Sequence, residues 1–141
     1  MAAFVDTNIL LYALSSTNQG ETDKVDAAKA LVGELMEQSD LVLSAQVLSE
    51  FASVSMRKGS PPLSLGDVSR MIEDLLAHPV LPVDAPLVQA ALQRVQKSRI
   101  SYWDALIVEA AVRAGASVLY TEDLHHGVVY DGVEVRNPFQ S

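Results

Sequence analysis

Cysteine is absent from this chain of 141 residues, which excludes a disulfide framework and any metal site built on thiolates. That absence is compatible with a reducing cytosol, and we expect a cytoplasmic protein. No stretch approaches the roughly 18 consecutive apolar residues of a membrane-spanning helix, so we expect no membrane contact. The apolar start lacks a basic leader and carries Asp6 and Asn8, so it is interpreted as a buried strand entering a helix and not as a signal peptide.

Basic residues are also scarce. Ten Lys and Arg stand against 18 Asp and Glu, and the formal net charge is −8. This sign argues against binding of nucleic acid through a broad positive field. The objection weakens if several carboxylates converge on divalent cations, because such a site would be locally neutral. Substrate would then be held by bound metal and by local basic patches.

Apolar residues make up 49% of the chain, and its length predicts one domain, residues 1–141, with a single core. Short apolar runs alternate with helical patterns. Strands are expected at 2–5, 41–43, 80–83, 117–121 and 133–136, and helices at 8–14, 21–37, 44–58, from 64, from 84 and at 101–114. This alternation predicts an α/β fold with a central parallel sheet of four to five strands and helices on both faces.

Four acidic residues fall where the expected strands end or the expected helices begin. Asp6 follows the first strand, and Asp123 follows the strand at 117–121. Glu50 lies in the second turn of one helix, and Asp104 lies in the first turn of another. Ligands of an open parallel sheet bind beyond the carboxyl ends of its strands, near the switch in strand order. At least three of the four acids therefore belong at that end.

The neighbours of three of these acids are apolar, and a carboxylate in core-type sequence is costly unless it is paired or bound to metal. Two carboxylates about 4 Å apart repel by about 4 kcal/mol at an effective dielectric constant of 20. A cluster of four needs compensating charge, and Mg²⁺ or Mn²⁺ is the natural choice for oxygen ligands.

Each acid also has a structural explanation. Asp6 and Asp123 can be turn or capping residues, and Asp104 can favour the dipole of its helix. Glu50 is the hardest to explain in this way, because it lies mid-helix between apolar neighbours. The four acids together, at one end of a sheet, favour a site.

Several segments resemble the PIN-domain nucleases, especially the VapC-like toxins of bacterial toxin–antitoxin pairs. The matching segments are FVDTNILLYA at 4–13, LSEF at 48–51, SYWDALIVEAA at 101–111, LYTEDL at 119–124 and VEVRNPF at 133–139. The resemblance covers essentially the whole chain. It implies a parallel sheet flanked by helices and Mg²⁺- or Mn²⁺-dependent cleavage of RNA, with a cognate antitoxin and a homodimer as expected partners.

By matching position, the resemblance gives the family's acidic roles, catalytic and metal-binding, to Asp6, Glu50, Asp104 and Asp123. It gives supporting polar roles to Thr7, Asn8 and Thr121. Glu122 competes with Asp123 for the fourth acidic role. Alternation along an extended strand places Thr121 and Asp123 on one side and Glu122 on the other, which favours Asp123.

Two basic groups could contact the RNA backbone: Arg94, Lys97 and Arg99 before Asp104, and Arg57 and Lys58 at the end of the helix that carries Glu50. Solvated helix ends explain them equally well.

Four other residues are given structural roles. Trp103 is expected in the core or in an interface, and Glu109 on the solvent side of its helix. His125 and His126 are expected in a surface turn that ends at Gly127. The alternative to a nuclease is a PIN-like scaffold that no longer cuts. A phosphatase or a receiver domain is disfavoured, because the first strand is followed by Asp-Thr-Asn and not by Asp-x-Asp or paired acids.

Overall fold

The computed structural model describes residues 1–17 and 20–140. Its strands are β1 (Ala3–Val5), β2 (Leu41–Ser44), β3 (Val80–Leu81), β4 (Val118–Tyr120), β5 (Val129–Tyr130) and β6 (Val133–Arg136). Its helices are α1 (Thr7–Leu14), α2 (Thr22–Glu37), α3 (Ala45–Arg57), α4 (Leu65–Leu75), α5 (Ala85–Ser98) and α6 (Tyr102–Arg113). The expected helices and strands are all present. The strand expected at 80–83 ends at Leu81, because Pro82 has no N–H to donate to a neighbouring strand.

The strands form one sheet in the order β3-β2-β1-β4-β6-β5. The neighbouring pairs from β3 to β6 are parallel, which confirms the predicted parallel sheet. The sequence analysis missed β5, which pairs antiparallel with β6 through a turn at Asp131 and Gly132. Both turn residues have positive φ, at 46° and 88°, as a tight hairpin turn requires. The Asp-Gly pair was the available signal, whereas a strand of two residues is too short to show alternation.

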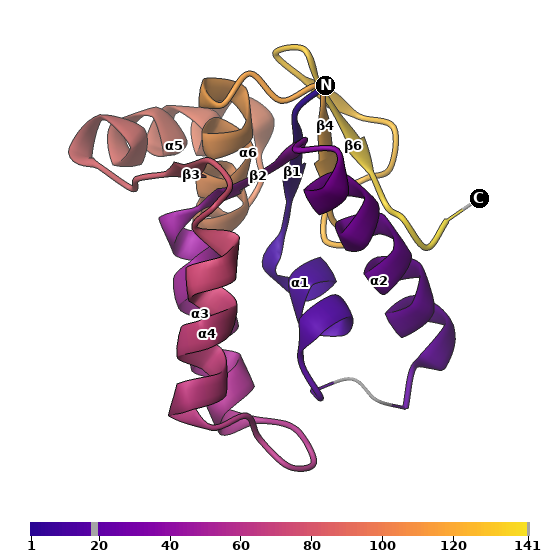
Figure 1. The fold of residues 1–141 in the computed structure, drawn as a ribbon. Coiled ribbons are helices and arrows are strands. Elements are labelled where there is room, and N and C mark those ends of the chain that lie inside the picture. Colours follow the sequence, from indigo (N-terminus) through magenta and orange to yellow (C-terminus); the bar gives the residue numbers. More distant parts are fainter. Residues whose placement is uncertain (18–19, 141) are drawn as a thin grey trace.

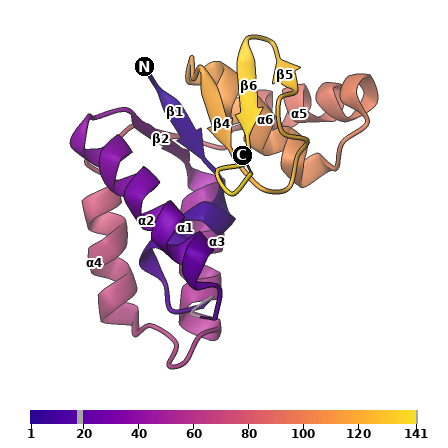
Figure 2. The ribbon, with the colours of Figure 1, turned by 90° about the vertical axis from the view of Figure 1, so that its right-hand side faces the viewer.

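The chain reverses its direction of travel across the sheet at β1. It passes outward from β1 to β2 and β3, then returns so that β4 lies on the other side of β1. Right-handed connections therefore place α5 and α6 on the face opposite to α1 and α2. Figures 1 and 2 show this arrangement, with α2 on one side of the sheet and α5 and α6 on the other. The segments that leave the carboxyl ends of β1 and β4 run in opposite directions, and a parallel sheet has a crevice at such a point.

The neighbouring strands β1 and β2 are buried along their whole length, as expected for parallel strands that helices cover on both faces. The core includes Phe4 from β1, Leu43 from β2 and Phe51 from α3, each fully buried. This core fixes the ends of β1 and β4, which Asp6 and Asp123 follow. Across residues 1–17 and 20–140, no helix combines the length and apolarity needed to cross a bilayer.

Candidate metal centre

Asp6 connects β1 to α1 and is the most constrained of the four acids. Its Oδ1 accepts a hydrogen bond from the backbone N of Thr7 at 2.7 Å, so it caps α1. Its Oδ2 accepts a hydrogen bond from Oγ1 of Thr121 at 2.8 Å. Only 6% of the Asp6 surface is exposed. Asp6 therefore is the helix cap that the structural explanation anticipated, and its carboxylate also faces the end of β4.

Burial raises the pKa of Asp6 from 3.8 to about 6, against the hydrogen bonds from Thr121 and Thr7, which lower it. The carboxylates of Asp123 and Glu50 raise it further. The ionised form of Asp6 is therefore costly near neutral pH, and a cation beside it would relieve that cost.

All four acids line one cavity of about 230 Å³. Glu50 reaches it from α3, Asp104 from the first turn of α6, and Asp123 from the segment after β4. The cavity is lined by Asp6, Thr7, Asn8, Leu11, Gln46, Glu50, Val54, Trp103, Asp104, Ile107 and Asp123. Burial raises the pKa of Asp123 as well, and the negative charges of Asp104 and Glu122 raise it further. The structure thus brings together acids that are distant in the sequence.

The cavity is open to solvent, since Glu50 and Asp123 are exposed and Asp104 is half-buried. Within the described ranges, no three Asp, Glu, His or Cys side chains are grouped closely enough to hold a metal ion by themselves. The donors are all oxygens, which suits Mg²⁺ or Mn²⁺. Because Mg²⁺ keeps several waters and binds through one or two carboxylates, an open set of acids fits such an ion. A closed cage is not needed.

Two threonines hold the acids in place. Oγ1 of Thr7 donates to Oε1 of Glu50 at 3.3 Å, and Oγ1 of Thr121 accepts from the backbone N of Asp123 at 3.1 Å. Thr121 therefore contacts Asp6 and Asp123 at once. Asn8 lines the same cavity. These are the positions that the sequence analysis assigned supporting polar roles.

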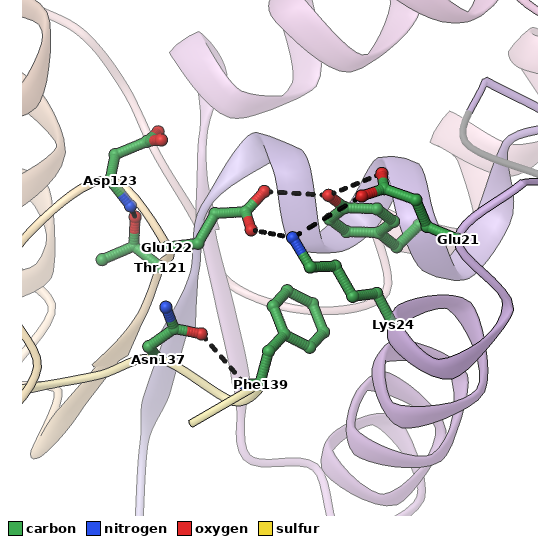
Figure 3. A network of polar contacts seen from close by, with 8 residues as sticks. Glu21, Lys24, Thr121, Glu122, Asp123, Asn137 and Phe139 are labelled. Carbon is green, nitrogen blue, oxygen red and sulfur yellow. Dashed lines mark hydrogen bonds and ion pairs between the residues drawn. The ribbon is translucent and has the colours of Figure 1, made fainter. Parts of the chain in front are cut away.

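Glu122 lies outside this cavity. Its carboxylate faces α1 and α2, where Oε1 accepts from the hydroxyl of Tyr12 at 3.0 Å and Oε2 accepts from Nζ of Lys24 at 3.1 Å. Figure 3 shows the side chains of Glu122 and Asp123 pointing in different directions from adjacent positions. The alternation that favoured Asp123 as the cavity-facing acid agrees with this geometry.

Arg94 does not extend toward the acids. Its side chain is 7% exposed and forms ion pairs with Glu109, at 2.7 Å, and with Asp131. Asp131 precedes β6, so this pair lies at the amino ends of the parallel strands, opposite to the cavity. The expectation that Glu109 faces solvent is wrong, because its carboxylate neutralises a buried guanidinium. Lys97 lines the same small pocket as Arg94 and Asp131.

The remaining cations, Arg57, Lys58 and Arg99, are exposed. Arg57 and Lys58 end α3, the helix that carries Glu50, and Arg99 caps α5 with φ 56°. Arg99 lies two residues before the N-cap of α6, whose first turn carries Asp104. It is therefore close in the chain to the cavity.

The sequence analysis missed Gln46, which lines the cavity four residues before Glu50 on α3. That spacing places both side chains on one helix face and was the available signal. The side-chain amide of Gln46 donates to the backbone O of Trp103 at 3.4 Å and so links α3 to α6. Trp103 is 65% exposed and lies outside the core. His126 lies in the expected surface turn, where its Nδ1 accepts from the backbone N of Asn137.

A family model described as PIN domain matches residues 3–131. A search of curated proteins found no match. Among solved structures, the chain is similar to VapC20 of Mycobacterium tuberculosis, described as a toxin that cleaves the sarcin-ricin loop. The TM-score is 0.62 at 22% identity, over 86% of this chain and 90% of that one. Likeness at this level of identity is a likeness of fold.

Proposed function

This chain belongs to the PIN domain family, whose members are nucleases, and from that premise we propose that it is a metal-dependent endoribonuclease. The observation that carries the proposal is the convergence of Asp6, Glu50, Asp104 and Asp123 on one cavity at the switch in strand order. We further propose that the protein is the toxin of a toxin–antitoxin pair. The fold shared with an RNA-cleaving toxin supports this role.

The proposed reaction is hydrolysis of an RNA phosphodiester. Water attacks phosphorus, the bond to the leaving ribose oxygen breaks, and a phosphate monoester and a hydroxyl group are formed. Asp6 and Asp104 would hold Mg²⁺ or Mn²⁺, with Glu50 and Asp123 completing the site directly or through water. When bound, the ion stabilises the negative charge that develops on the phosphate.

The residues of the chain have distinct tasks in this scheme. Thr121 and Thr7 fix both oxygens of Asp6, so the carboxylate binds a cation without losing side-chain freedom at that moment. Glu50 is solvent-exposed and is held by Thr7 through Oε1, and it would accept a proton from the attacking water. Asp123, which Thr121 links to Oδ2 of Asp6, would serve the leaving-group side of the phosphate.

Substrate and partners are part of the same proposal. We expect Arg57, Lys58 and Arg99 to contact phosphates that flank the site, because these cations remain exposed. We do not propose a phosphate contact for Arg94, which is engaged in buried ion pairs. Nor do we propose one for Lys97, which lines the same pocket as Arg94. A homodimer, a cognate antitoxin that blocks the cavity, and a cytoplasmic location remain our expectations.

The test is an RNA cleavage assay with the purified chain in Mg²⁺ or Mn²⁺, with and without chelator. Asp6→Asn and Asp104→Asn should each abolish cleavage while keeping the folded circular dichroism spectrum, since Asn at position 6 can still cap α1 and the cap of α6 is Ser101. Asp74→Asn, at an exposed acid of α4, is the matched control and should cut normally. Equal cutting by all three variants would contradict the proposed site. RNA binding without metal-dependent cutting would favour the non-catalytic scaffold.

A further inference from the structure

Lys24 of α2 lies at the centre of a cluster formed by three distant segments of the chain. Its Nζ is 3.1 Å from Oε2 of Glu122 and 3.7 Å from Oε1 of Glu21. The same Nζ lies 5.6 Å from the ring centroid of Tyr12 and 5.3 Å from that of Phe139. Two carboxylates and two aromatic faces thus surround one ammonium group (Figure 3).

Tyr12 holds the other oxygen of Glu122. Its hydroxyl lies 3.0 Å from Oε1 of Glu122 and 3.2 Å from Oε2 of Glu21. Burial, together with the hydrogen bond to Glu122, raises the pKa of Tyr12 to about 12, so the hydroxyl remains a donor at neutral pH. The Tyr12 ring meets Phe139 edge to face at 5.2 Å. Both carboxylate oxygens of Glu122 therefore have a partner.

The segment held in this way leads into the acidic cavity. Residues 121–124 follow β4 and belong to no helix or strand. Thr121 is bonded to Arg136 through its backbone and to Asp6 through its side chain. The backbone N of Asp123 donates to a side chain, Oγ1 of Thr121. The direction of Asp123 consequently depends on side-chain contacts made by its two predecessors.

We propose that Lys24 and Tyr12 are positioning residues that act through Glu122 to keep Asp123 directed into the acidic cavity. Glu122 serves as an anchor and not as a metal ligand. The inference rests on the proposed function of the cavity as a metal site. It assigns α1 and α2 a part in that site, although neither Lys24 nor Tyr12 lines the cavity.

The proposal is tested by direct Mn²⁺ binding to the full chain, measured by isothermal titration calorimetry without RNA. The direction in which the Mn²⁺ affinity of a variant changes distinguishes a positioning role from a purely electrostatic one. Loss of a positive charge near a cation site should tighten cation binding if only electrostatics acts. Loss of a positioning contact should weaken it. We expect Lys24→Met to raise the Mn²⁺ dissociation constant about 3- to 10-fold, and Lys24→Arg to restore much of the affinity. Lys29→Met, an exposed lysine on the same helix, controls for charge and should bind as the wild type does.

Tyr12→Phe provides a second variant without any change in charge, and it keeps the ring contacts with Lys24 and Phe139. It should also weaken Mn²⁺ binding, by about 2- to 3-fold. In a chain that already carries Asp123→Asn, Lys24→Met should have no further effect, since the residue through which it acts is gone.

Equal or tighter Mn²⁺ binding by Lys24→Met would overturn the proposal and leave the proposed nuclease function intact. So would a full additional loss in the Asp123→Asn background, which would mean that Lys24 does not act through Asp123. Failure of the wild-type chain to bind Mn²⁺ at all would overturn the proposed function itself, and the positioning role with it.

Discussion

The hydroxyl of Thr121 donates a hydrogen bond of 2.8 Å to Oδ2 of Asp6 and so links the ends of the neighbouring parallel strands β4 and β1. The same oxygen of Thr121 accepts from the backbone N of Asp123. One hydroxyl thus orients two acids that approach the cavity from different strands. Its O–H group bonds to the buried carboxylate of Asp6, because a hydrogen bond to a charged acceptor is stronger than one between neutral groups.

Replacing Thr121 with Val tests this link with little change in side-chain shape. The buried Asp6 carboxylate would lose a charge-assisted hydrogen bond, and the free energy of unfolding near pH 7.5 should fall by about 1–3 kcal/mol. Urea unfolding followed by circular dichroism measures the change, and Thr121→Ser is the control that keeps the hydroxyl. Equal stability of the Val and Ser variants would mean that the bond is not formed in solution.

Stability should also depend on pH through Asp6. Its pKa in the folded chain is about 6, above the ordinary value of 3.8 for an Asp side chain, so the folded state binds the proton more tightly than the unfolded state does. This contribution is fully present below pH 4 and is lost as the pH rises to about 6. A difference of roughly two pKa units corresponds to about 3 kcal/mol.

The measurement is urea unfolding of the wild type and of Asp6→Asn between pH 4 and 7.5, in chelator. The wild-type stability relative to the variant should fall by about 3 kcal/mol across this range, and addition of Mg²⁺ at pH 7.5 should restore part of it. A difference between the two proteins that stays constant with pH would show that Asp6 titrates normally.

The sequence sufficed for the positions of the helices and the parallel strands, because their signals are local. Ser44 and Ser101, for example, are expected helix starts, and each caps its helix by accepting from a backbone N three residues later. Because the carboxyl ends of parallel strands lie at one edge of the sheet, the placement of Asp6 and Asp123 at that edge also followed from the sequence.

Long-range pairing was beyond the sequence. The sequence did not reveal the long-range partners of Arg94, Lys24 and Glu122, because they lie 15 to 110 residues away, with no periodic pattern to relate them. A cation near Asp104 in the sequence therefore suggested a phosphate contact, whereas α5 turns Arg94 toward Glu109 at the opposite edge of the sheet. Burial of a charged side chain depends on which elements pack together, and sequence spacing does not report that.

Arg94→Met should separate the structural role of this residue from any part in RNA binding. Removing the guanidinium leaves the partly buried Glu109 without its partner, so the free energy of unfolding should fall by about 3 kcal/mol. This is the lower end of the usual range, because Asp131 is half-exposed and can be solvated. RNA affinity per folded molecule should not change. A loss of RNA affinity in a variant of unchanged stability would restore the original expectation.

Arg99 offers the reciprocal case, a cation proposed to contact RNA that has an exposed side chain. Its φ of 56° favours Asn among uncharged replacements, so Arg99→Asn removes the charge and keeps the backbone conformation. RNA affinity should be measured by filter binding at several salt concentrations, in a chain made inactive by Asp104→Asn. A lost phosphate contact should weaken binding at low salt and reduce the slope of log affinity against log salt by about 0.7, the value for one phosphate of a single strand. Arg70→Asn, on α4, is the control, since Arg70 pairs with Asp67 on the surface of its own helix. If both variants reduce the slope equally, Arg99 contributes only general charge and the proposed contact is wrong.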